Sequence, residues 1–193
     1  MSAVNRPWTP APLAAATAAA PAATGAAADA KTRVWIGRWL VSSAVANGLM
    51  AGTYVLFSVW VMPMLGRKND AGFVDSMQKI NVQIENPLFF AAFFGAMAFP
   101  AIAAWKQRKT GGGTAMKWAV AAFALYTTTV LTTSGINVPL NEMLASKGDA
   151  NPAKARADFE DVWNLWNGVR AVLTTAAFAA SIQAVRVFRR NRG

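Results

Sequence analysis

Cysteine and histidine are both absent from this chain of 193 residues. Without thiolate and imidazole groups, zinc, haem iron, iron–sulfur clusters and type 1 copper lose their usual ligands, and no disulfide can form. The eight methionines offer thioether ligands for copper, but methionine more commonly fills irregular gaps in packing. We therefore expect no cofactor and no metal bound through thiolate or imidazole groups, and a metal held by carboxylates stays an open alternative.

Charged residues are also scarce, at 15%, whereas 54% of the residues are hydrophobic. This composition is too apolar for a soluble domain of this size and indicates a membrane protein. The net charge of +10 does not point to nucleic acid, because much of it flanks apolar runs. We expect contact with the lipid bilayer and no nucleic-acid partner.

Four apolar runs account for this composition. Three of them, at 39–66, 86–105 and 118–141, are bounded by charged residues and reach the ~20 residues that a bilayer requires. The fourth, at 171–185, is too short alone and becomes a full span only if it begins at Val162, which places Arg170 inside it. The pattern predicts an all-α fold, an integral membrane four-helix bundle, with the membrane domain at 34–188.

Lysine and arginine gather before the first run, between the second and third, and after the fourth. The positive-inside rule then predicts that both termini are cytoplasmic. The expected location is the inner (cell) membrane of a bacterium. Residues 1–33, rich in alanine and proline, are predicted to be a disordered tail, and 189–193 a basic tail. A signal peptide is the alternative for the first segment, although it lacks a core rich in leucine or valine.

The two loops predicted on the outer side carry similar segments, which begin at Phe73 and Phe159. In each segment an aspartate follows two residues after the phenylalanine and an asparagine eight residues after it, and each segment comes after an apolar-Pro-apolar turn. The chain is therefore predicted to contain two duplicated helix-loop-helix halves in the same orientation. Sites in such duplications often lie between the halves.

Helical spacing puts the polar side chains of each segment on one helix face. Gln78 and Asn81 are three residues apart, as are Asn164 and Asn167, and Arg170 continues the second series. An ionised side chain within a span costs about 2.5–3.5 kcal/mol and is usually kept for pairing or function. Arg170 is therefore either a functional cation or half of a structural ion pair, for which Asp161 and Glu142 are the candidates.

Further amides and tryptophans lie near this face. Asn137 and Asn141 flank Pro139 at the outer end of the third run, and Trp163 and Trp166 flank the asparagine series of the fourth. Together they predict a polar vestibule with aromatic walls. The tryptophans have an alternative interpretation as an interfacial belt. Asn86-Pro87 is typical of a helix start, with asparagine as the N-cap.

These residues resemble the anthrone oxygenase-like family of small four-helix membrane proteins, over residues 40 to 185. The resemblance is carried by Val61-Met62-Pro63, Phe73, Met77-Gln78-Lys79-Ile80-Asn81, Asn86-Pro87, Asn137-Val138-Pro139-Leu140-Asn141, Trp163, Trp166-Asn167 and Arg170. Fungal members are implicated in oxidising an anthrone to an anthraquinone with dioxygen. The resemblance implies such an oxygenase, acting without a cofactor on an apolar aromatic small molecule.

The same chemistry suggests a role for each candidate residue, since it needs a base, an anion stabiliser and a dry pocket. Asp161 or Glu142 is expected to act as the base and Arg170 to stabilise the enolate. The expected substrate-binding residues are Gln78, Asn81, Asn137, Asn141, Trp163, Trp166 and Asn167. The alternative is a non-catalytic membrane protein, either a small carrier or a partner subunit, and the chain is also a candidate homo-oligomer.

Overall fold

The computed structural model describes residues 20–191, with side chains from residue 27 onward. The chain forms two units, residues 1–34 and 35–193. Helix α1 (Ala20–Leu56) begins earlier than the predicted tail boundary at residue 33, because its first turns consist largely of alanine, the strongest helix former. Residues 1–19 and 192–193, with the rest of both predicted tails and the possible signal peptide, lie outside the described residues.

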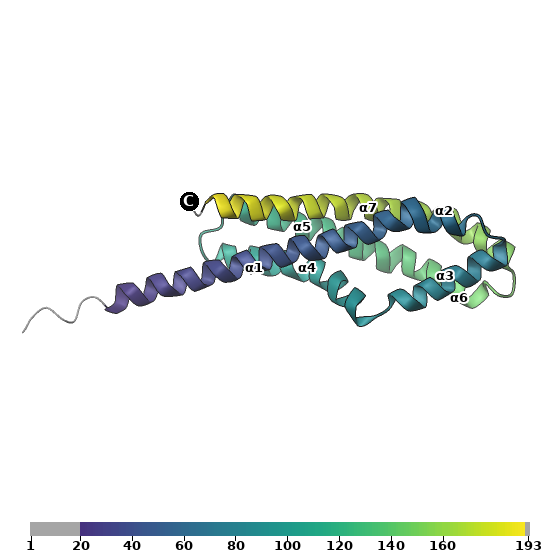
Figure 1. Ribbon diagram of the computed structural model, residues 1–193, viewed down its shortest axis with the longest axis horizontal. Coiled ribbons are helices and arrows are strands. Elements are labelled where there is room, and N and C mark those ends of the chain that lie inside the picture. Colours follow the sequence, from purple (N-terminus) through teal and green to yellow (C-terminus); the bar gives the residue numbers. More distant parts are fainter. Residues whose placement is uncertain (1–19, 192–193) are drawn as a thin grey trace, which may run out of the picture. The chain divides into compact units, whose positions relative to one another are not determined.

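Helices make up nearly all of the second unit, from Trp35 onward (Figure 1). After α1 come the π-helix η1 (Phe57–Val61), α2 (Met62–Leu65), α3 (Asp70–Ile84), α4 (Pro87–Arg108), α5 (Thr114–Thr132), the π-helix η2 (Thr133–Asn137), α6 (Val138–Lys147) and α7 (Pro152–Arg190). Four stretches are long and apolar enough to cross a membrane: Ala27–Leu65, Pro87–Arg108, Thr114–Lys147 and Pro152–Arg190. The predicted all-α, four-helix membrane fold is confirmed.

The segments predicted as outer loops are largely helical. Asn69 caps α3 by accepting a hydrogen bond from the Gly72 amide at 2.8 Å, and Asn151 caps α7 in the same way through Lys154 at 3.1 Å. With 39 residues, α7 is about 58 Å long, well beyond the ~30 Å hydrocarbon core of a bilayer. Its first part therefore joins α2, α3 and α6 in a helical extension of the bundle, which we call the outer cap.

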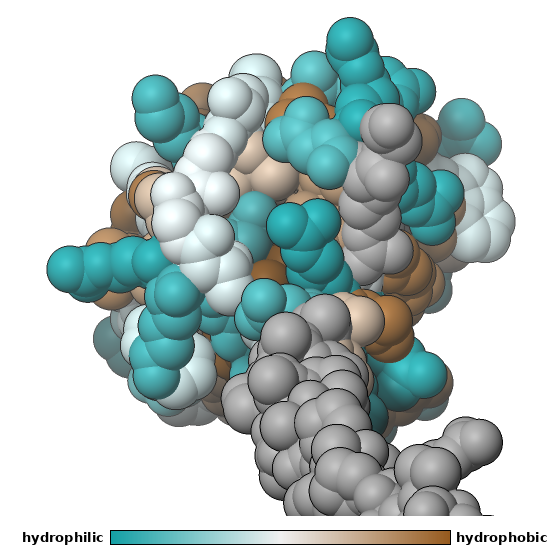
Figure 2. Space-filling model, turned by 90° about the vertical axis from the view of Figure 1, so that its left-hand side faces the viewer, coloured by the Kyte–Doolittle hydropathy of each residue, from teal (hydrophilic) through white to brown (hydrophobic). Residues whose placement is uncertain are grey.

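Three hydrophobic clusters fill the interior of the second unit. The cluster in the outer cap contains Met62, Leu65, Phe73, Val74, Met77, Leu144, Ala155, Phe159 and Trp163. The middle cluster contains Ala46, Met50, Tyr54, Phe93, Ala96, Tyr126, Ala171 and Ala177. The third, with Ile36, Leu40, Ala103, Ala104, Ala119 and Ala184, lies toward the end that carries the C-terminus. Hydrophilic side chains gather at that end (Figure 2).

One arginine secures the outer cap. Arg156 on α7 donates hydrogen bonds to the carbonyl oxygens of Lys68 (2.9 Å) and Gly66 (3.1 Å), which lie in the turn between α2 and α3. Its Nε donates to Glu160 at 2.6 Å, and its guanidinium carbon lies 4.6 Å from the centre of the Phe73 ring. Arg156 thus satisfies carbonyl groups that the end of α2 leaves unpaired, and fixes the α2–α3 turn to α7.

Two features support the predicted duplication. Both π-helices begin six residues before a proline, η1 before Pro63 and η2 before Pro139. Proline removes a backbone donor and crowds the preceding turn, which favours a local change of helix type. Phe73 and Phe159, which correspond in the two sequence segments, contact each other edge to face with ring centres 6.1 Å apart. Such a contact between equivalent residues is expected near an axis that relates the two halves.

The two halves differ where α3 ends and α4 begins. Asn86 accepts a hydrogen bond from the Phe89 amide at 3.0 Å and Pro87 occupies the first turn of α4, so the predicted helix start at Asn86-Pro87 is confirmed. In the second half, α7 continues without a break. If Asn81 corresponds to Asn167, then Ile84 corresponds to Arg170. The break between α3 and α4 therefore lies at the position in the first half that corresponds to Arg170 in the second half.

Candidate functional site

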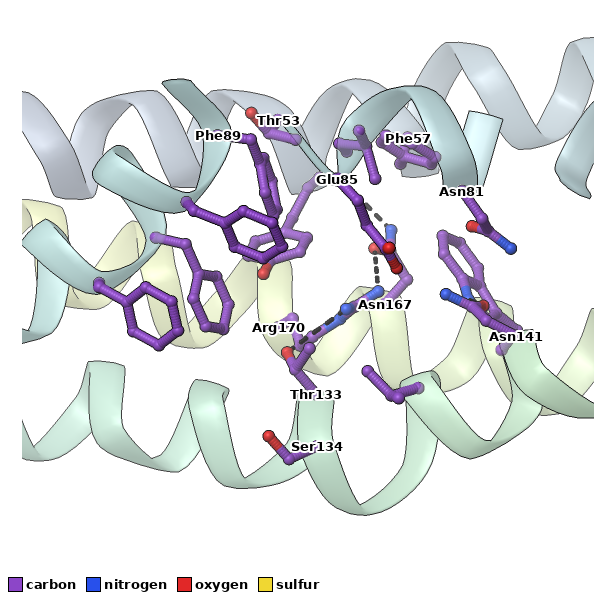
Figure 3. Close-up of a pocket in the computed structure, with 17 residues that line it drawn as sticks. Thr53, Phe57, Asn81, Glu85, Phe89, Thr133, Ser134, Asn141, Asn167 and Arg170 are labelled. Carbon is purple, nitrogen blue, oxygen red and sulfur yellow. Dashed lines mark hydrogen bonds between the residues drawn. The ribbon is translucent and has the colours of Figure 1, made fainter. Parts of the chain in front are cut away.

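A cavity of about 240 Å³ lies within the second unit, beside the break between α3 and α4 (Figure 3). The lining residues are Thr53, Tyr54, Phe57, Asn81, Ile84, Glu85, Phe89, Phe90, Phe93, Phe94, Thr133, Ser134, Val138, Asn141, Trp163, Asn167 and Arg170. They come from both sequence halves. The cavity also lies between the outer-cap and middle clusters, because Trp163 belongs to the first and Tyr54 and Phe93 to the second.

Four phenylalanines at the start of α4 form an aromatic wall of the cavity. Phe89 stacks on Phe93 with ring centres 5.8 Å apart, and Phe90 stacks on Phe94 at 6.1 Å. Residues four apart lie on one helix face, so the helix itself produces these two stacks. Phe90 and Phe94 are also exposed on the outer surface of the bundle. The wall therefore reaches from the cavity to the surface that faces lipid.

Arg170 supplies the positive charge of the cavity and is only 5% exposed. Its Nη2 donates to Asn167 Oδ1 at 2.9 Å and its Nη1 to Thr133 Oγ1 at 3.4 Å, whereas Nε has no hydrogen-bond partner. The guanidinium carbon lies 4.5 Å from the centre of the Tyr54 ring and 5.3 Å from that of Trp163. These contacts hold the group in place but do not neutralise its charge.

No carboxylate among the described residues lies within 4 Å of the Arg170 guanidinium. The ion pair with Asp161 or Glu142, the structural alternative for this arginine, is thus not formed. Asp161 precedes Arg170 by nine residues, which at 100° per residue puts it on about the opposite side of α7. Glu142 is exposed on α6 and does not line the cavity. Arg170 therefore has no ion-pair partner among the described residues.

Asn167 positions the arginine. Its Nδ2 donates to the Tyr54 carbonyl oxygen at 3.1 Å and to Ser58 Oγ at 2.8 Å, and its Oδ1 accepts from Arg170. Both polar atoms of the Asn167 side chain are therefore hydrogen-bonded within the protein. Asn167 orients the guanidinium and joins α7 to α1 at the edge of the cavity.

The structure brings five of the predicted site residues to the cavity: Asn81, Asn141, Trp163, Asn167 and Arg170. Trp163 Nε1 donates to Asn141 Oδ1 at 2.9 Å, so the tryptophan ring and the amide fix each other. Trp163 is buried, 4% exposed, and belongs to the outer-cap cluster. The ring faces the interior of the protein and not the surface where an interfacial belt would lie.

The other predicted residues lie elsewhere. Gln78 donates to the Leu144 carbonyl oxygen at 2.9 Å and joins α3 to α6. Trp166 is half-buried outside the cavity lining, and Asn137 is 1% exposed with no partner for either side-chain polar atom. Asp161 lines a separate polar depression with Arg156. The structure does not bring Gln78, Trp166, Asn137, Asp161 or Glu142 to the cavity.

Sequence reasoning missed the carboxylate that does line the cavity, Glu85, and the tyrosine beneath the guanidinium, Tyr54. Glu85 directly precedes the helix start at Asn86-Pro87, which marks the break between two helices, where a side chain can turn inward. The paired phenylalanines, which recur four residues apart at the start of α4, are visible in the sequence as well. No three carboxylates of the described residues are grouped as a metal site.

The fold and the cavity define a small four-helix membrane protein with an arginine-centred, aromatic-walled cavity. Residues 87–180 match the family model described as anthrone oxygenase, which confirms the predicted resemblance to the anthrone oxygenase-like family over that segment. The matched segment contains α4 to most of α7 and includes Asn141, Trp163, Asn167 and Arg170. In the same comparisons, no curated protein and no solved structure matches the chain.

Proposed function

We propose that this protein is a membrane-bound oxidoreductase that oxidises an anthrone or a related apolar phenol with dioxygen, without a cofactor. The observation that carries the proposal is the buried Arg170 guanidinium beside an aromatic wall. Among the described residues, its Nε has no hydrogen-bond partner and no carboxylate lies within 4 Å of it. A planar aromatic ligand with an electron-rich oxygen complements both parts of the site. The family match over residues 87–180 supports the same chemistry.

The proposed reaction starts when Arg170 binds the carbonyl oxygen of the anthrone. Loss of a proton from the ring methylene gives an enolate, whose negative oxygen Arg170 stabilises. The enolate carbon then transfers electrons to dioxygen and bonds to it, and the resulting peroxide anion takes back the proton from the base to form a hydroperoxide. Water leaves with both methylene hydrogens and one oxygen atom, and the other oxygen atom becomes the second carbonyl. Four electrons pass from the methylene carbon to dioxygen, and the products are one anthraquinone and one water.

Glu85 is the base in this proposal, in place of Asp161 or Glu142. It is the one acidic residue among those that line the cavity. A general base must come within hydrogen-bonding reach of the proton it removes, directly or through one water, and a base on the wall of the cavity meets that requirement. Asp161 and Glu142 do not contribute to that wall.

Oxygen uptake by the purified protein in detergent, with anthrone as substrate and anthraquinone quantified as product, tests this function. We expect one dioxygen consumed per anthraquinone formed, well above the rate without protein. Glu85→Gln should lower the rate by about 10²–10⁴-fold, the usual contribution of a general base, because the amide cannot take up the proton. Loss of activity in Glu142→Gln or Asp161→Asn instead would return the role to those residues. A rate no higher than without protein would contradict the function itself.

The non-catalytic alternative, a small carrier, uses the same cavity. Asn81, Asn141 and Asn167 all line the interior cavity and do not form a polar stripe on the outer surface, which favours binding of a small molecule over docking of a partner subunit. A carrier would bind the aromatic ligand and leave oxygen consumption unchanged. The oxygen measurement therefore separates the two functions.

We also propose that both termini face the cytoplasm of a bacterial cell, since the loop between α4 and α5 and the end of α7 are basic. Because the chain has no cysteine, a single introduced cysteine gives an unambiguous label. Ala150→Cys, in the outer turn before α7, should react with a membrane-impermeant maleimide in intact cells. Thr110→Cys, in the basic loop, should react only after the cells are permeabilised. The reverse pattern would contradict this orientation.

A further inference from the structure

A second recess lies on the surface of the bundle, away from the Arg170 cavity, between α1 and α7. Its volume is about 620 Å³, and it is lined by Val41, Ala44, Val45, Gly48, Leu49, Phe178, Ile182, Val185, Arg186 and Arg189. Eight of these residues carry no polar side-chain group, and the other two are arginines. We call this recess the α1–α7 groove.

The apolar part of the groove depends on small side chains. A Cβ atom at Gly48 would come within 2.9 Å of the Phe178 ring, so the absence of a side chain there lets the ring form one wall of the groove. Val45 and Leu49 on α1 are each 58% exposed and border the groove. Between Val41 and Leu49 the helix rises about 12 Å, which is enough to hold a large part of an acyl chain along its length.

The charged part lies at one end. Arg186 and Arg189 follow the apolar run that ends at Val185, which places them at the depth of lipid headgroups. Both are exposed, and neither lies within 4 Å of a carboxylate among the described residues. Every acidic residue from Trp35 onward lies between Asp70 and Asp161, in or beside the outer cap. Among the described residues from Trp35 onward, no carboxylate therefore balances the positive charge at this end of the groove.

We propose that the α1–α7 groove binds an anionic phospholipid, with an acyl chain against Gly48 and Phe178 and the phosphate on Arg186 and Arg189. An apolar trough that ends in two unpaired guanidinium groups at headgroup depth matches a lipid that joins a hydrocarbon chain to a negative phosphate. A second copy of the chain fits less well, because two copies would bring four arginines together without acids. This site is independent of the chemistry proposed for the Arg170 cavity.

Native mass spectrometry of the detergent-purified protein tests the proposal, with phosphatidylglycerol and phosphatidylcholine of identical acyl chains titrated separately. We expect wild type to bind phosphatidylglycerol more tightly. Arg186→Gln with Arg189→Gln should weaken that binding by roughly fivefold per arginine and remove most of the preference. Arg108→Gln with Arg190→Gln is the matched control, because it removes the same charge from the same membrane side outside the groove, and it should keep the preference.

Ala44→Leu tests the apolar part, since the larger side chain fills the groove and should weaken binding of both lipids without changing their ratio. Equal loss in the control pair would show general attraction to a basic surface and overturn the proposal, as would equal binding of the two lipids by wild type. If inorganic phosphate bound with the same affinity as phosphatidylglycerol, the acyl chain would have no role in binding, and the proposal would be overturned. A dimer that Ala44→Leu converts to monomer would assign the groove to a second copy.

Discussion

Replacing Arg170 with methionine is expected to lower the rate of anthrone oxidation by about 10²–10³-fold, the usual effect of removing a donor that stabilises a developing oxyanion. Methionine keeps much of the length and apolar contact of the arginine stem but carries no charge and no donor. The substitution therefore leaves the Tyr54 and Trp163 rings with a neighbour of similar shape, while the enolate loses its counter-charge. Steady-state oxygen uptake measures the loss.

Stability distinguishes this effect from misfolding. The buried guanidinium has no carboxylate partner in the part of the chain that the structure describes. Its removal therefore relieves a desolvation cost and should leave the thermal midpoint in detergent unchanged or raised. Arg108→Met, at an exposed cation in the last turn of α4, serves as the control and should keep full activity. A folded Arg170→Met variant that kept the wild-type rate would contradict the assigned role, and a lowered thermal midpoint would contradict the expected relief of the desolvation cost.

Replacing Phe159 with alanine is expected to destabilise the protein by about 3–5 kcal/mol, the range for truncating a buried aromatic residue. Phe159 is 0% exposed, contacts Phe73 across the two halves, and stacks on Trp163 with ring centres 5.9 Å apart. The cavity left by its removal would lie at the centre of the outer cap. Because Trp163 also lines the binding cavity, ligand binding should weaken as well.

Leu165→Ala is the matched control for this prediction, because it removes a large apolar side chain from the same helix at a position that is 66% exposed. Reversible unfolding by denaturant in detergent compares the two variants, and Leu165→Ala should change the free energy of unfolding by less than about 1 kcal/mol. If the two substitutions had equal effects, the outer cap would not be a packed core.

The membrane fold follows directly from the sequence, because apolar length and flanking charge are local properties. The break at Asn86-Pro87 is also local, since asparagine caps and proline starts a helix through their own covalent structure. The outer cap was harder to predict. Segments around Asp70 and Asp149 contain enough polar residues to read as loops, and their helical form depends on burying Phe73, Leu144 and Phe159 together.

The sequence predicts only part of the site, because local spacing does not show which residues tertiary packing brings together. The spacing within one segment identifies Asn81, and the spacing within the other identifies Asn167 and Arg170. Glu85 and Tyr54, in contrast, reach the cavity through tertiary packing. Asp161 follows the repeat pattern, yet its position on α7 turns it away from Arg170. Periodicity within a helix therefore identifies its polar face. It does not predict which carboxylate from elsewhere in the chain lines the cavity.

The central claim is that the unpaired guanidinium of Arg170 holds the oxygen of a planar aromatic ligand. Equilibrium binding of anthraquinone, measured without oxygen for the wild-type and Arg170→Met proteins in detergent, tests it most directly. We predict saturable binding to wild type and a dissociation constant about 10–100-fold higher for the variant, the value of a hydrogen bond to a charged group. Equal affinities, or no saturable binding to wild type, would contradict the claim.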